Sequence, residues 1–354
     1  MSDLATSILI VRHGPGLGRF VRYGERTLDW IRRHDPALAG RILVHETGTG
    51  ALPTSAAGAG AVVFWLADPL RELYPGCYSE AMEIADLAAR RGARVVNPPA
   101  ALSNTAKSVQ ARLWDQAGVP CAVARRFADR AELAALLDGM SMPVIVRPDL
   151  LHAQQGMRVC CTPAEALAAA QPDPRSPGAV VPFMDSREDY RRRDPESVWA
   201  QFYHKKRVYV FGDFVMPVHV FFSASPVVAW AGSTFSRYQG WGSLVQWLAY
   251  LRRLDRAALA ADISFSRSAA EQPALMRRAA SALGLDVVAI DYSTFADGSV
   301  VLWEANPHPS IPAWRNTGMP LARRTFPRVQ RIYAETAAFF HTLVHDSIGH
   351  RRTA

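Results

Sequence analysis

The sequence AIDYSTFADGSVVLWEANPHP, at residues 289–309, contains two apolar runs separated by the turn signal Asp297-Gly298. Two such runs around such a turn predict a hairpin of two strands. Asp291 ends the first predicted strand, and Glu304 and Asn306 end the second. Glu304 and Asn306 are two positions apart, so they face the same side of their strand. The hairpin is therefore expected to bring three oxygen-bearing side chains to one point.

These three side chains suit a hard cation. Carboxylate and amide oxygens are ligands that Mg²⁺ accepts, and Mg²⁺ usually completes its shell with phosphate oxygens and water. A plainer alternative is that Glu304 and Asn306 only line a turn. However, Glu304 follows the apolar run 300–303, and burying an unpaired carboxylate is costly. We therefore expect Glu304 to have a partner.

The spacing of these residues resembles a known motif. Glu304 follows Asp291 after 13 positions (304 − 291 = 13), and Asn306 and Pro307 come next. This pattern resembles the metal-binding strand pair of the ATP-grasp superfamily, which includes D-alanine–D-alanine ligase, glutathione synthetase and the ribosomal-protein glutamate ligases. The resemblance implies an ATP-grasp fold in which Asp291, Glu304 and Asn306 hold Mg²⁺ beside ATP.

Two upstream segments occur in the family's order. The predicted helix around Lys107, followed by AGVP, is similar to the helix that carries the family's first phosphate-binding lysine. Without that context, Lys107 would be read as a surface lysine. Residues 143–157, PVIVRPDLLHAQQGM, resemble the strand and flexible loop that close over the phosphates. This resemblance implies nucleotide contacts from Arg147, His152 and Gly156. Arg147 stands where many relatives have lysine, and its planar fork still binds phosphate.

A third segment resembles the hinge that receives adenine. It implies that Gln201, Phe202 and Tyr203 lie near the base. The sequence that follows, RVYVFGD, resembles a strand of the glutamate-ligase branch and implies that Arg207 points towards a phosphate or an acyl-phosphate. Lys205-Lys206, between these segments, favours a solvated turn.

The resemblance implies an ATP-dependent ligase. Such an enzyme activates a carboxylate as an acyl-phosphate with MgATP and couples it to an amine or similar nucleophile. Many relatives have arginine two residues before the first metal-binding aspartate, where this chain has Ala289. Ala289 and the single glycine of the phosphate loop leave a second function open: an ATP-binding but catalytically degenerate homologue that acts as a binding or regulatory module. The acid, the nucleophile and the oligomeric state, a homodimer included, are not specified.

Composition excludes several classes of protein. The 354 residues are 49% hydrophobic and 20% charged, which is apolar enough for a large core and excludes disorder as the main state. Four cysteines are too few for a disulfide framework, so we expect reduced thiols. We find no secretory signal and no apolar stretch of about 18 residues. We therefore expect a cytoplasmic protein with no membrane partner.

The net charge of +8 points to an anionic partner. The basic run Arg191–Arg193 is interrupted by acidic neighbours, so residues 185–197 predict a solvated loop rather than a nucleic-acid patch. An anionic nucleotide with small-molecule carboxylate and amine substrates accounts for the charge without nucleic acid. Salt-dependent binding to nucleic acid is the remaining alternative.

The order of predicted elements indicates an α/β fold with an α+β lid. Short buried strands over 7–11, 61–66 and 94–97, with an amphipathic helix over 79–91, predict a parallel amino-terminal lobe. We divide the chain into this pre-ATP-grasp lobe (1–102), a small lid subdomain with the phosphate loop (103–197) and a carboxy-terminal lobe with the metal site (198–354). Further strands are expected over 198–203 and 226–231.

Overall fold

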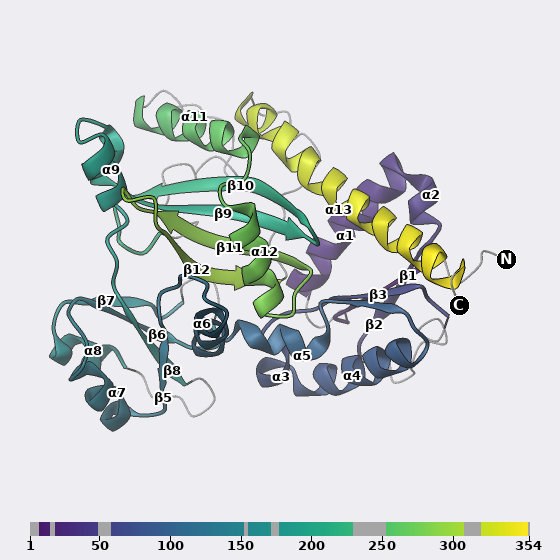
Figure 1. Ribbon diagram of the computed structural model, residues 1–354, viewed down its shortest axis with the longest axis horizontal. Coiled ribbons are helices and arrows are strands. Elements are labelled where there is room, and N and C mark those ends of the chain that lie inside the picture. The colour runs from purple at the N-terminus through teal and green to yellow at the C-terminus, as the bar shows by residue number, and fades with distance from the viewer. Residues whose placement is uncertain are drawn as a thin grey trace.

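The protein is described from a computed structural model that covers residues 7–14, 18–48, 58–151, 155–170, 177–228, 253–307 and 320–352. Three four-stranded sheets organise these residues. Sheet A lies at one end of the molecule and sheet C at the other, with sheet B between them (Figure 1). In the described part of the chain, no helix has the length and apolar character needed to cross a membrane.

Sheet A is parallel and has the strand order β2-β1-β3-β4. Its first strand is buried on both faces, as expected for a parallel sheet covered by helices. The strands are β1 (Ile8–Arg12), β2 (Ile42–Glu46), β3 (Ala61–Trp65) and β4 (Arg94–Val96). The helices of this lobe are α1 (Gly18–His34), α2 (Pro36–Ala39), α3 (Leu70–Leu73), α4 (Pro75–Arg90) and α5 (Pro99–Leu102). The predicted parallel lobe is confirmed.

Sheet C and its two helices form a small subdomain, which we call the lid. Its order is β5-β8-β6-β7, and all its neighbours are antiparallel. The strands are β5 (Arg125–Phe127), β6 (Val144–Pro148), β7 (Arg158–Cys160) and β8 (Gly178–Pro182). Helices α7 (Arg130–Leu137) and α8 (Pro163–Ala169) begin where Asp129 and Thr162 accept hydrogen bonds from first-turn amides.

Sheet B is antiparallel, with the order β10-β9-β11-β12. The strands are β9 (Tyr203–Phe211), β10 (Phe214–Ser223), β11 (Val287–Thr294) and β12 (Val300–Asn306). The predicted hairpin is therefore β11–β12, although Asp291 lies inside β11 rather than at its end. The surrounding helices are α6 (Lys107–Gln116), α9 (Glu188–Arg193), α11 (Arg253–Arg267), α12 (Pro273–Ala282) and α13 (Pro320–Arg352), with short 3₁₀ turns η4 (Ser103–Thr105) and η5 (Val198–Gln201).

Two charged segments differ from their predictions. The expected loop 185–197 contains α9, whose Asp189 is fully buried and 2.5 Å from Arg193. The expected turn at Lys205-Lys206 lies inside β9. The lysines fit in this strand because carboxylates from Asp291 and Glu271 lie beside them.

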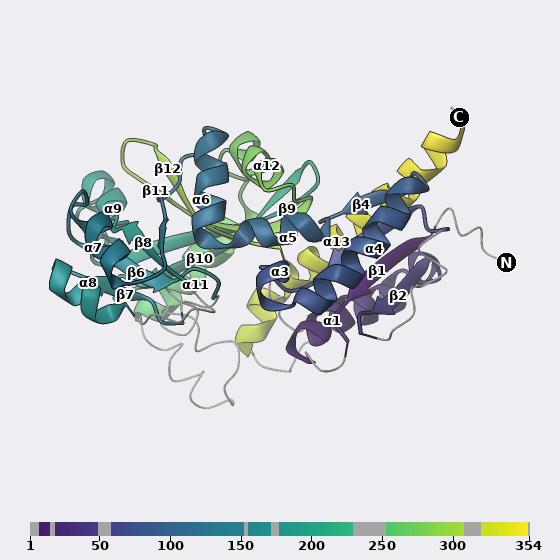
Figure 2. The same cartoon turned by 90° about the horizontal axis from the view of Figure 1, so that it is seen from below.

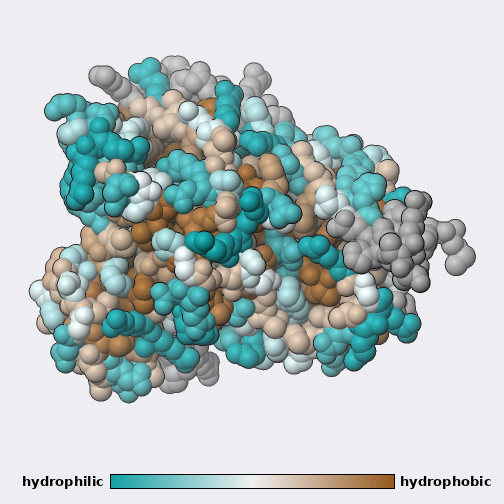
Figure 3. All heavy atoms as spheres, in the orientation of Figure 1, coloured by the Kyte–Doolittle hydropathy of each residue, from teal (hydrophilic) through white to brown (hydrophobic). Residues whose placement is uncertain are grey.

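Two apolar segments also differ. Residues 198–201 form η5 instead of a strand, and β9 begins only at Tyr203. Residues 226–228 form no strand, and the remainder of that predicted strand lies outside the described residues. Figure 3 shows apolar surface along the boundary between the lid and the lobe of sheet B.

Apolar clusters join sheets A and B but leave the lid separate. One cluster contains Leu9 of β1 with Val208 of β9, and a second contains Ile10 with Tyr209 and Ile332 of α13. Helix α13 extends from α11 to the amino-terminal lobe (Figures 1 and 2). The buried residues of the third cluster all come from the lid, within residues 127–180.

Candidate functional site

A cavity lies between the lid and sheet B. About 850 Å³ of space free of protein atoms lies there, part of it open solvent. Its lining includes apolar side chains, among them Ile145 and Val181 of the lid, and charged ones, among them Lys107, Arg147 and Glu304. A ligand that carries both an apolar ring and negative charge would match this lining.

The structure places Lys107 at the start of α6, against the end of β12. Its Nζ is 2.7 Å from Glu304 Oε1, and its side chain is only 3% exposed. Arg147 of β6 approaches the same oxygen at 3.9 Å. Lys107 is therefore the partner that we expected for the buried Glu304 carboxylate.

Helix α6 is held in place by the lid and by β12. Asp149, just after β6, accepts hydrogen bonds from the Ser108 amide (2.7 Å) and hydroxyl (2.8 Å). This carboxylate caps the helix where its own N-cap residue, Ala106, has no polar side chain. At the other contact, the Ala305 amide donates to Gln110 Oε1 at 2.8 Å. These bonds fix Lys107 relative to both Arg147 and Glu304.

Asp291 lies beside Glu304 in the β11–β12 register and beside Arg207 in the β9–β11 register. Arg207 donates from Nε to Oδ1 at 2.6 Å and from Nη2 to Oδ2 at 2.9 Å. Lys205 Nζ is 2.9 Å from Oδ2. Burial alone would raise the pKa of Asp291, but attraction to Arg207 and Lys205 outweighs it and lowers the pKa below its ordinary value.

We call these six residues the charge cluster; they are Lys107, Arg147, Lys205, Arg207, Asp291 and Glu304. Four cations converge on two carboxylates, a surplus of two positive charges (4 − 2 = 2). The side chains are between 0% and 19% exposed. Because surplus charge in a site with little solvent attracts counter-ions strongly, the cluster is suited to a polyanion.

The residue types of the predicted metal ligands suit a divalent cation. Asp291 and Glu304 are register neighbours, and Asn306 is two residues further along β12, opposite Ala289. The Asn306 side chain is buried at Nδ2 without a hydrogen-bond partner, so no bond at that atom holds the amide in place. Among the described residues, no three His, Cys, Asp or Glu side chains form a metal-binding group. Two carboxylates with an amide oxygen leave positions for phosphate oxygens, as Mg²⁺ requires.

Other predicted contacts are arranged differently around the cavity. Gln201, Phe202 and Tyr203 do not line it; Tyr203 packs against Phe183, with ring centroids 6.1 Å apart. The cavity wall between lid and sheet B is instead the connecting segment, residues 183–186, which contributes Phe183, Met184 and Ser186. Gly156 adopts a φ of +70°, a conformation that favours glycine.

His152 of the phosphate loop lies outside the described residues. Arg207, Asp291 and Asn306 are not among the residues that line the cavity. Asp291 is instead in contact with Lys205, which does line it.

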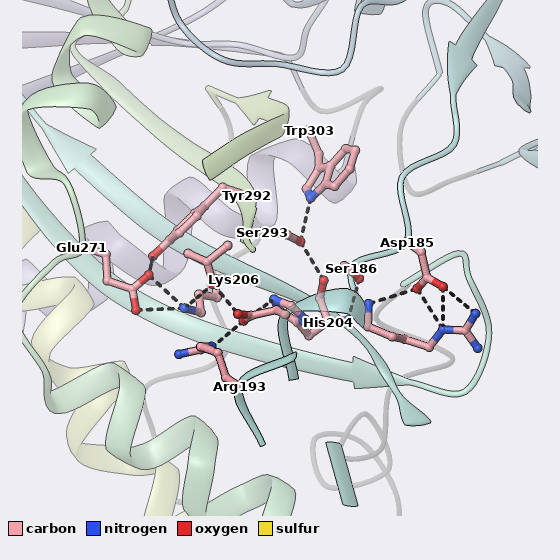
Figure 4. A network of polar contacts seen from close by, with 12 residues as sticks. Asp185, Ser186, Arg193, His204, Lys206, Glu271, Tyr292, Ser293 and Trp303 are labelled. Carbon is pink, nitrogen blue, oxygen red and sulfur yellow. Dashed lines mark hydrogen bonds and ion pairs between the residues drawn. The ribbon is translucent and has the colours of Figure 1, made fainter. Parts of the chain in front are cut away.

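Sequence reasoning missed several cavity residues, among them Trp303 and His204. Figure 4 shows a chain of hydrogen bonds that includes both. Trp303 Nε1 donates to Ser293 Oγ (2.8 Å), which donates to the His204 carbonyl (2.7 Å). The His204 amide donates to Ser186 Oγ at 3.0 Å. This chain ties β12, β11 and β9 to the connecting segment, and no local sequence pattern signals it.

The same network continues on the side of α9 (Figure 4). Lys206 Nζ is 2.8 and 2.9 Å from the two Glu271 oxygens, and Tyr292 donates to Glu271 at 3.2 Å. Thr294 donates to buried Asp189 at 3.2 Å. Burial, reinforced by the charge of Lys206, lowers the pKa of His204 to about 4, so this imidazole is neutral at pH 7.

A parallel lobe, an antiparallel lid and an antiparallel sheet that faces the lid across a charged cavity define the ATP-grasp fold. Solved structures support this assignment. The chain is similar to a D-alanyl-alanine synthetase A from Vibrio cholerae (TM-score 0.54, 11% identity, 96% of this chain and 98% of the other). It is also similar to the D-cycloserine synthetase DcsG (TM-score 0.52, 15% identity, 91% and 100%).

A third similar structure is an ADP complex of N5-carboxyaminoimidazole ribonucleotide synthetase (TM-score 0.50, 14% identity, 86% of this chain and 70% of the other). No protein-family model matches the chain, and no curated protein matches it at a significant level. These likenesses confirm the predicted fold.

Proposed function

We propose that the protein is an ATP-dependent ligase that joins a carboxylate to an amine or similar nucleophile. The observation that carries the proposal is the charge cluster, in which four cations meet two buried carboxylates and of which Lys107, Arg147, Lys205 and Glu304 line the cavity. The ADP complex of the ribonucleotide synthetase supports a nucleotide in a cavity of this fold.

In the proposed arrangement, the base of ATP lies against the apolar wall formed by Ile145, Val181 and the connecting segment. Lys107 and Arg147 bind the phosphates, while Asp291, Glu304 and Asn306 hold Mg²⁺. Bound Mg²⁺ would neutralise charge between phosphate oxygens.

A substrate carboxylate oxygen attacks the terminal phosphorus, and the bond to ADP breaks. Arg207 does not line the cavity, so it would stabilise negative charge on the transferred group at a distance, as part of the charge cluster. The amine then attacks the acyl carbon, and phosphate leaves. The lid covers this end of the cavity and excludes water, which would otherwise hydrolyse the acyl-phosphate.

One observation favours a second function, nucleotide binding without ligation. Ala289 is fully buried in an apolar cluster with Tyr209, so position 289 supplies no cation where many relatives have arginine. A regulatory or binding module would retain the nucleotide contacts and lose the chemistry.

The test is thermal unfolding with and without MgATP, followed by an ADP-release screen. A ligand at about 100 times its dissociation constant stabilises a protein by roughly 2.7 kcal/mol. We expect a rise in Tm for the wild type that Lys107→Met abolishes and that Glu83→Gln, an exposed control on α4, retains. The names of two similar structures, a D-alanyl-alanine synthetase and a D-cycloserine synthetase, make amino acids the first acids and amines to screen.

The outcomes separate the candidates. Nucleotide binding with ADP release for an acid and amine pair supports the ligase. Binding without release for any pair supports the degenerate homologue. A wild type that shows no shift with ATP refutes both.

A further inference from the structure

Lys205 has a position that its sequence context did not indicate. It lines the cavity, its side chain is 14% exposed, and its Nζ is 2.9 Å from Asp291 Oδ2. The centroid of the Phe221 ring is 5.7 Å from Nζ. Lys206, the next residue, makes its ion pair with Glu271 instead. Two adjacent lysines on one strand therefore serve different partners.

Asp291 holds two cations, and they are not equivalent. Arg207 contacts both carboxylate oxygens through two nitrogens, at 2.6 and 2.9 Å, and this bidentate geometry is fixed. Lys205 approaches only Oδ2, as a single charge on a flexible four-carbon stem. Of the two, Lys205 is the cation that can leave Asp291 with the smaller rearrangement.

The surplus of positive charge determines which kind of ligand can displace Lys205 from Asp291. The cluster carries two more positive than negative charges. A divalent cation that entered alone would add to this surplus in a buried site, which is unfavourable. Phosphate oxygens entering the cavity would offset the surplus and offer Lys205 a new anionic partner.

We propose that Lys205 changes partner when nucleotide binds: its ammonium leaves Asp291 for a phosphate oxygen, and Asp291 becomes available to the divalent cation. This inference rests on the proposed function, because it requires a nucleotide in the cavity. In this proposal Lys205 binds phosphate when nucleotide is present and competes with the divalent cation for Asp291 when it is absent. Nucleotide then binds before metal, and the free protein holds divalent cations weakly.

The test measures two affinities by titration calorimetry on the full chain: ATP with EDTA, and Mn²⁺ without nucleotide. Lys205→Met should weaken metal-free ATP binding about 10- to 100-fold, the effect of losing a charged hydrogen bond. The same change should strengthen Mn²⁺ binding about tenfold, because Asp291 loses a competing cation. Lys205→Gln should act in the same directions. Lys206→Met is the matched control and should alter neither affinity.

Weaker ATP binding together with stronger Mn²⁺ binding in the Lys205 variants distinguishes a partner exchange from a structural role. The inference is overturned if Lys205→Met and Lys205→Gln weaken both affinities or change neither. It is also overturned if the wild type binds Mn²⁺ equally well with and without ATP, or if Lys206→Met reproduces the effects. A wild type that binds no ATP under any condition refutes the proposed function instead.

Discussion

The pair between Asp291 and Arg207 provides a stringent test of how the charge cluster is held together. Asp291→Asn keeps the shape of the side chain and removes its charge, which leaves Arg207 and Lys205 without their main partner. Asp291 is fully buried, and the two bonds from Arg207 are 2.6 and 2.9 Å long. Breaking a buried pair on one side costs about 3–5 kcal/mol. We expect the free energy of unfolding of the ligand-free protein to fall by about that amount.

Removing both partners should cost less than the sum of the single changes. We expect the double variant Asp291→Asn/Arg207→Met to show a coupling energy of about 2 kcal/mol, within the range for contacting residues. Urea unfolding followed by tryptophan fluorescence measures all four proteins of the cycle. Glu188→Gln, which removes an exposed pair with Arg192 at 3.1 Å, is the control and should cost less than about 1 kcal/mol. Additivity within about 0.5 kcal/mol would refute the reasoning.

Two further predictions concern stability. Burial is the main cause that lowers the pKa values of His204 and His219 to about 4. Below about pH 6.5 the unfolded chain takes up protons at these histidines, whereas the folded protein does not. The free energy of unfolding should therefore be unaffected by them above that pH and fall by about 2 kcal/mol for each histidine by pH 5. Urea unfolding at pH 7 and pH 5 measures this loss, and a glutamine variant of either histidine that leaves it unchanged contradicts the cause. Gly178→Ala should destabilise the lid by about 1–3 kcal/mol, because its Cβ would lie 2.0 Å from the Phe127 ring. Gly76→Ala on α4 meets nothing within 4 Å and should instead stabilise by up to about 1 kcal/mol; equal thermal shifts for the two variants would exclude this contrast.

Much of the fold could be predicted because its signals are local. The apolar runs of β1 and β3, with an amphipathic helix between β3 and β4, predict parallel strands, and sheet A has them. The turn at Asp297-Gly298 joins β11 and β12 as an antiparallel pair. Each of these signals depends on residues within one or two neighbouring elements.

The errors occur where distant partners stabilise the structure. Lysine is rare in strands, so Lys205 and Lys206 favour a turn until Asp291 and Glu271, more than sixty positions later, lie beside them. Asp189 is buried because α9 packs its carboxylate near Arg193 and Thr294. The pattern of residues within a charged run does not predict such contacts with distant residues.

The candidate site also has a part that could be predicted from the sequence and a part that could not. Asp291 and Glu304 are predicted from their residue type and spacing, and Lys107 and Arg147 from the resemblance to the ATP-grasp superfamily. The structure brings all four into one cluster. The connecting segment has no charged or glycine-rich signature, since its contribution to the cavity is an apolar wall and backbone. Only the position between the lid and sheet B identifies it.

The distribution of the apolar clusters has a mechanical consequence. Strand β1 and helix α13 belong to one continuous body, because they share a core with sheet B, whereas the lid has a core of its own. Because the two cores are separate, a change in the angle between the lid and this body would leave both cores packed. A ligand that contacts Arg147 and Glu304 together bridges the lid and this body. We therefore expect its binding to change the angle between them, and a pair of fluorescent probes on the lid and α13 would follow that change.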